Sequence, residues 1–119
     1  MTPQPVCAFE FDFAPDGRVL VIGVSGKLDP PAVEELTPRV DDAYRGGARR
    51  FVFDLSRLDY AGSLALRLFV GLHNRVRGEG AVVLCNPTAA LRSVLELTRV
   101  NQVLRLYPSR AEAIDAVLA

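Results

Sequence analysis

One serine stands at a position where the chain could present a reactive hydroxyl. Ser63 follows Gly62 between an apolar run that begins at Phe51 and a segment of helical periodicity that ends near Val76. At a helix start the first backbone N–H groups lack intrahelical partners and the helix dipole is positive. We therefore predict that the Ser63 hydroxyl is exposed and chemically addressable, with a plain helix-capping hydroxyl as the alternative role.

Few other residues could support chemistry. Asp54, at the end of the apolar run, is the best carboxylate, although a polar turn residue bonded to local N–H groups is the favoured interpretation. His73 is the single histidine of the chain, and in mid-helix an exposed polar role is favoured over catalysis. No phosphate-cradling GxxxxGK[ST] or GxGxxG motif follows a strand. We predict that the protein is not an enzyme and has no catalytic residue.

The two cysteines are unlike a metal or redox pair. Cys7 and Cys85 lie in apolar, strand-like surroundings without CxxC spacing, so buried free thiols are favoured over a disulfide. This cysteine usage suits a reducing compartment. One histidine and two separated cysteines exclude the usual zinc ligand sets. We predict no metal and no cofactor.

Length and charge limit the classes of protein that remain. The chain has 119 residues, half of them apolar, which predicts one domain over residues 1–119. Lys plus Arg and Asp plus Glu number 14 each, so direct nucleic-acid binding is not expected. The N-terminus resembles no secretory leader, and no apolar run approaches the roughly 18 residues of a membrane span. We predict a soluble cytoplasmic protein without membrane insertion.

The first third of the chain reads as a hairpin followed by a helix. Residues 7–13 alternate phenylalanine with acidic residues, which predicts an edge or antiparallel strand, and a turn at 15–17 leads to a second strand over 18–25. An apolar stripe from Val33 to Tyr44 predicts a helix capped by Asp29. Because Pro38 lies inside that stripe, we expect a kink or break near residues 34–37.

Strands and helices then alternate to the end of the chain. We predict a strand over 51–56, a short polar turn and a helix with its buried stripe at Ala65, Leu68, Phe69, Leu72 and Val76. A strand over 81–85, a helix over 88–97, a strand over 103–107 and a terminal helix capped by Ser109 with Glu112 follow. The fold class is therefore α/β, with a mixed, mainly parallel sheet of about five strands and about four helices.

Several of these segments together resemble the STAS domain family along nearly the whole chain. The resemblance is carried by Gly26-Lys27-Leu28-Asp29, by Asp54-Leu55-Ser56, by the junction before Ser63 and by Leu95-Glu96-Leu97-Thr98. Within the family the chain looks most like bacterial anti-sigma factor antagonists. These are small cytoplasmic domains that bind an anti-sigma factor, often itself a serine kinase, and so free a sigma factor for transcription.

The resemblance implies a phosphorylation site, but the motif around it has changed. The family junction usually reads Asp-Ser-x-Gly, with a phosphorylated serine, and ungapped counting places it on Gly62-Ser63-Leu64-Ala65. The serine is kept as Ser63, whereas Gly62 replaces the acidic residue and Ala65 replaces the glycine. Arg99 stands where the family tends to have a glycine, which is a further departure at a helix end.

The resemblance also implies a partner-binding surface where strands run into helices. It joins the loop Lys27, Leu28 and Asp29 with Tyr60, Gly62, Ser63, Leu66 and Arg67, of which Leu66 and Arg67 are expected to point away from the buried stripe. The expected function is partner switching in transcription regulation. The protein would sequester a GHKL-type kinase anti-sigma factor and be controlled by phosphorylation of Ser63. The altered junction leaves an alternative, a STAS subunit that binds the ATPase of a phospholipid-transport ABC complex constitutively.

Overall fold

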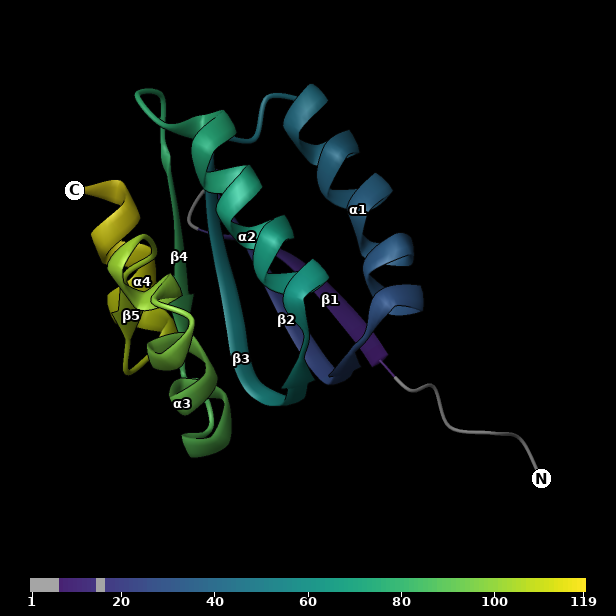
Figure 1. The fold of residues 1–119 in the computed structure, drawn as a ribbon. Helices are drawn as coiled ribbons and strands as arrows, with labels where there is room; N and C mark the ends of the chain where they lie inside the picture. Colours follow the sequence, from purple (N-terminus) through teal and green to yellow (C-terminus); the bar gives the residue numbers. More distant parts are fainter. Residues whose placement is uncertain (1–6, 15–16) are drawn as a thin grey trace.

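The computed structural model describes residues 7–14 and 17–119. Its strands are β1 (Cys7–Ala14), β2 (Val19–Leu28), β3 (Arg50–Ala61), β4 (Ala81–Cys85) and β5 (Leu106–Tyr107). Its helices are α1 (Pro30–Arg45), α2 (Ser63–Val76), α3 (Ala89–Leu97) and α4 (Arg110–Leu118), with a 3₁₀ turn at Val100–Gln102 (Figure 1). The predicted turn at 15–17 and the N-terminal segment that was compared with a secretory leader lie wholly or partly outside the described residues.

The five strands form one sheet in the order β1-β2-β3-β4-β5. β1 pairs antiparallel with β2, and every later pair is parallel. A helix connects β2 to β3 and another connects β3 to β4, as parallel neighbours require. The predicted α/β class, with an antiparallel first strand and four helices, is confirmed.

The helices cover the two faces of the sheet unequally. The larger apolar cluster joins Leu20, Ile22 and Phe53 to the buried residues of α1, α2 and α3, and α1 and α2 lie side by side on that face in Figure 1. The smaller cluster joins Val21 and Val52 to α4 on the opposite face. Because strands alternate their side chains between faces, β2 and β3 are apolar on both sides where α4 covers them.

The central strand is longer than the sequence predicted. A polar turn was expected after Ser56, but β3 runs on to Ala61 and stays paired with β2 through Tyr60 and Ala61. Shifts in the pairing with β2 carry Leu58 and Ala61 back toward the core. The polar residues of this part of β3 are exposed, so they resemble a turn in the sequence: Ser56, Arg57, Asp59 and Tyr60.

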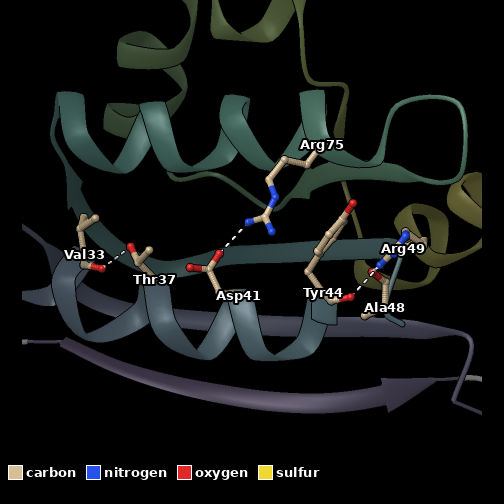
Figure 2. A network of polar contacts seen from close by, with 7 residues as sticks. All are labelled: Val33, Thr37, Asp41, Tyr44, Ala48, Arg49 and Arg75. Carbon is tan, nitrogen blue, oxygen red and sulfur yellow. Dashed lines mark hydrogen bonds and ion pairs between the residues drawn. The ribbon is translucent and has the colours of Figure 1, made fainter. Parts of the chain in front are cut away.

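Three further expectations need correction or refinement. Helix α1 continues through Pro38 without a break, and the Thr37 hydroxyl just before it donates to the Val33 carbonyl at 2.7 Å (Figure 2). The last strand is confined to residues 106–107, because residues 103–104 form a turn and a bend after the 3₁₀ turn at 100–102. Arg99 itself adopts the left-handed conformation, with φ 62°, which a glycine adopts without strain.

Candidate functional site

The ends of β2 and β3 bring the two predicted site segments together. Lys27 lies opposite Tyr60, and Leu28 lies opposite Ala61, in the parallel pairing of these strands. Lys27 and Leu28 are thus the last residues of a strand, where a loop was predicted. Asp29 caps α1, since its Oδ1 accepts the Ala32 N–H at 3.1 Å. The segments that precede α1 and α2 therefore form one continuous edge of the sheet.

Helix α2 differs from the other helices in how it begins. The first turns of α1, α3 and α4 are capped by side-chain oxygens of Asp29, Thr88 and Ser109. At α2 the N-cap residue is Gly62, which has no side chain to accept a hydrogen bond. Ser63 is the first helical residue, not the cap, so the alternative of a capping hydroxyl is wrong. The start of α2 keeps unpaired N–H groups beside an exposed serine.

Two of the residues that were predicted to bind a partner are buried. Lys27, Ser63 and Arg67 are exposed, and Tyr60 is 49% exposed. Leu28 is fully buried and Leu66 is 7% exposed, so neither is presented to a partner.

The buried stripe of α2 is wider than a strict three-and-four spacing. Leu66 joins the core next to Ala65, while Leu68 is only half-buried. Leu64, which was not among the predicted site residues, is 41% exposed one residue after Ser63. The apolar residue that the helix start presents is therefore Leu64.

Asp54 is tied to two partners on the face that carries α4. Its Oδ1 accepts the Ser56 N–H at 3.0 Å, and its Oδ2 accepts Nε and Nη2 of Arg110 at 3.1 and 2.8 Å. Burial by itself would raise the pKa of Asp54, but the Ser56 N–H and the Arg110 guanidinium outweigh it and hold that pKa below its usual value. The predicted bond to a local N–H is confirmed, although Asp54 lies in a strand. Arg110, 56 residues away, left no local pattern that could have revealed it.

The cysteines and the histidine lie outside this edge of the sheet. Cys7 and Cys85 are both free thiols, as predicted, with Cys7 half-buried and Cys85 fully buried. Burial, and then the negative charge of Asp54, raise the pKa of Cys85 to about 12, so its reactive thiolate is scarce. His73 is half-buried in the last turns of α2, where an exposed position was expected.

A polar network fixes the opposite end of α2 to α1 (Figure 2). Arg75 donates to Asp41 at 2.6 Å, and its guanidinium carbon lies 4.1 Å from the centre of the Tyr44 ring. The guanidinium carbon of Arg49 lies 3.9 Å from the same centre, and its Nη1 donates to the carbonyls of Tyr44 and Ala48. The Tyr44 ring is therefore held between two cations, which stabilise the site's supporting helix from its far end.

The fold and this edge of the sheet can be compared with known proteins. The family model of the STAS domain matches residues 11–113. BtrV of Bordetella bronchiseptica, a candidate anti-sigma factor antagonist, is 29% identical over 99 residues, which cover 82% of this chain and 85% of BtrV. The chain therefore belongs to the STAS domain family.

Solved structures place the fold among those of anti-sigma factor antagonists. The unphosphorylated form of the antagonist SpoIIAA matches with a TM-score of 0.80 at 25% identity, over 93% of this chain and 96% of that one. The phosphorylated form of SpoIIAA, from Bacillus, matches with a TM-score of 0.72 at 25% identity, over 92% and 99%. In the described part of this chain no helix has the length and apolar character needed to cross a membrane.

Proposed function

We propose that this STAS domain, taken as one domain over residues 1–119, is a cytoplasmic anti-sigma factor antagonist that binds a GHKL-type serine-kinase anti-sigma factor. Binding sequesters the anti-sigma factor and frees a sigma factor, and phosphorylation of Ser63 ends it. The observation that carries the proposal is the start of α2, where an exposed serine stands in the first helical position without a side-chain cap. Membership of the STAS family and the likeness to both forms of SpoIIAA support it.

The chemistry of the switch follows from this position. The kinase would transfer the γ-phosphoryl group of ATP to the Ser63 Oγ, releasing ADP and the hydroxyl proton. The product carries about −1.5 to −2 charges at a helix start, where unpaired N–H groups and the dipole favour an anion, so the fold should persist. If the surface of the anti-sigma factor offers it no cation, a dianion removed from water in the interface costs several kcal/mol, and each 1.4 kcal/mol weakens binding about tenfold. Phosphorylation would therefore release the partner without unfolding the domain.

The test measures binding of the purified domain to each GHKL-type anti-sigma factor encoded in the source genome, by calorimetry. Wild type and Ser63→Ala are expected to bind one of them alike, and Ser63→Asp about 100-fold or more weakly. Asn74→Asp adds the same charge to the exposed far end of α2 and is expected to change affinity less than about twofold. Incubation with ATP and the anti-sigma factor that binds should add one phosphoryl group to wild type and none to Ser63→Ala.

Two results would overturn the proposal. One is the absence of binding to every anti-sigma factor in the panel. The other is equal binding of wild type and Ser63→Asp, which would exclude control at Ser63. An ABC-transporter ATPase is measured in parallel, and tight binding to it by both forms would assign the domain to a constitutive transport complex.

A further inference from the structure

Tyr60 is the largest side chain presented at the open edge of the sheet. It is the next-to-last residue of β3, lies opposite Lys27 of β2, and is 49% exposed. Leu64, 41% exposed, is the second residue of α2 and directly follows Ser63. An exposed tyrosine and an exposed leucine therefore flank Ser63 in the chain.

Gly62 is explained by Tyr60 and not by its own backbone. Its φ and ψ are −91° and −173°, an extended conformation that any residue adopts. A Cβ added to Gly62 would lie 2.8 Å from the Tyr60 hydroxyl oxygen and 3.4 Å from Cζ of the same ring. Because that contact is closer than a real Cβ makes, the phenol in this position requires a residue without a side chain. The Tyr60 ring thus lies directly over the backbone that leads into Ser63.

The segment that carries Ser63 offers a partner no acidic group next to the serine. No residue between Asp59 and Arg67 carries a formal charge. A partner surface with a cationic group aimed at this segment would bury that cation without an anion, which costs affinity. A partner with an apolar pocket and one hydrogen-bonding group for the phenol would bury the ring at little entropic cost, and tyrosine is enriched at such positions.

We infer that Tyr60, held over Gly62, is the residue that selects the partner, and that it fits an anti-sigma factor with an uncharged, apolar pocket beside its serine-binding site. The inference rests on the proposed function, since it names the determinant of that same interface. It assigns Gly62 a supporting role, because the glycine leaves the space that the phenol occupies. The same arrangement weakens binding of partners built to pair with an acidic residue before the serine, because Gly62 supplies no anion.

The experiment is a double-mutant cycle on affinity for the anti-sigma factor that wild type binds. Tyr60→Ala is expected to weaken binding about thirtyfold, a change typical of a central aromatic residue. Gly62→Ala is expected to weaken it about tenfold in the wild-type background and less than about twofold in the Tyr60→Ala background, because its effect acts through the ring. Phe13→Ala removes an aromatic that is 59% exposed at the opposite end of the sheet and serves as the matched control.

The fold is expected to survive these changes, because the atom that opposes a Cβ at Gly62 is the end of an exposed side chain. Ring resonances of Tyr60 in NMR spectra should shift in Gly62→Ala, while the rest of the spectrum stays. Gly62→Asp combined with Tyr60→Ala is measured against the remaining anti-sigma factors and should gain affinity for at least one that wild type does not bind.

The possible results distinguish a failure of the inference about Tyr60 from a failure of the proposed function. If wild type binds an anti-sigma factor and Tyr60→Ala binds it within about twofold, the inference is wrong and the proposed function stands. Equal effects of Gly62→Ala in both backgrounds would likewise overturn the role of Gly62 as the space for the ring. If wild type binds no anti-sigma factor at all, the proposed function fails and the inference falls with it.

Discussion

Helix α2 begins and ends in opposite ways. At its end Arg75 bonds Asp41, and the Tyr44 ring lies between two guanidinium groups, so three segments are fastened together. At its start no side chain caps the helix, and the exposed Ser63 bears no hydrogen bond within the described part of the chain. We call the end of α2 at Arg75 its closed end and the start at Ser63 its open end. The contacts of the closed end stabilise the position of the helix, and the open end has no such contacts. A helix fastened at one end can be bound or modified at the other without losing its place on the sheet.

Gly62, just before α2, and Gly80, four residues after its end, differ in the same way as the two ends of the helix. Neither Gly62 nor Gly80 has a positive φ, so both are required by space and not by backbone conformation. At Gly62 a Cβ would meet the tip of an exposed side chain at 2.8 Å, whereas at Gly80 it would overlap the carbonyl oxygen of Arg49. A side chain can turn away, but that carbonyl also accepts the Ala81 N–H at 3.0 Å and is fixed. Substitution of Gly62 should therefore cost little folding stability, whereas substitution of Gly80 should cost much more.

The largest effect is expected at the closed end. Gly80→Ala should lower the free energy of unfolding by about 3 kcal/mol, because backbone must move to admit the methyl group. Gly62→Ala should lower it by less than about 1 kcal/mol. Gly71→Ala is the control, since nothing lies within 4 Å of its added Cβ, and in a helix it should stabilise by up to about 1 kcal/mol. Urea unfolding followed by circular dichroism measures all three, and equal losses at Gly62 and Gly80 would remove the contrast between the two ends.

A smaller effect is expected for the pair that holds β3, the strand leading to the open end. Asp54→Asn keeps the size of the side chain and an acceptor for the Ser56 N–H, but it removes the anion facing Arg110. Because Arg110 is partly exposed, we expect a loss of about 1 kcal/mol at pH 7. The folded-state pKa of Asp54 lies below its unfolded value, so this contribution is present above about pH 4 and is lost as the pH falls through the folded-state pKa.

Urea unfolding of wild type and Asp54→Asn at pH 7 and pH 3 measures that loss. The difference between the two proteins should shrink at the lower pH. Arg110→Met should behave like Asp54→Asn, because it removes the other member of the pair. A difference that is the same at both pH values would mean that the charge of Asp54 does not contribute.

The parts of the fold that were predicted correctly have local causes. In β1 phenylalanine alternates with acidic residues, which indicates that one face of the strand is exposed to solvent. The helix caps at Asp29 and Ser109 each join residues three positions apart. A window of a few residues is therefore enough to predict a strand with one exposed face, a capped helix start, and the order of strands and helices. The same holds for the position of Ser63, because it follows from where one periodicity replaces another.

The parts that were missed depend on distant neighbours. The second half of β3 resembled a turn because its polar residues are exposed beyond Asp54, the residue that Arg110 at the start of α4 contacts. The sequence of β3 alone does not indicate where the contact with α4 ends. The burial of Leu66 and the exposure of Leu64 depend on how α2 is rotated against the sheet, and a one-residue shift of the apolar stripe is within the width of such a stripe. Arg110 reaches Asp54 only because α4 packs against β3.

The smallest expected effect tests whether the open end of α2 can hold a phosphate. Ser63 and Arg67 are both exposed and stand four residues apart on the helix, so a phosphate on Ser63 would face the guanidinium. The unpaired N–H groups and this cation favour the dianion, so the second phosphate pKa, about 6 in an unfolded chain, should fall in the folded protein. A pKa lowered by folding adds stability above pH 6 that is lost as the pH falls through the folded-state pKa.

Protein carrying phosphoserine at position 63, incorporated during translation, allows that pKa to be measured by phosphorus NMR. Arg67→Ala should raise the folded-state pKa by about 0.3, since a helical pair at this spacing contributes about 0.2–0.5 kcal/mol and one pKa unit is about 1.4 kcal/mol. The same protein in urea provides the unfolded reference. If folding leaves the phosphate pKa unchanged, the start of α2 does not stabilise the anion, and its lack of a cap would then serve contact with a partner rather than the phosphorylated state.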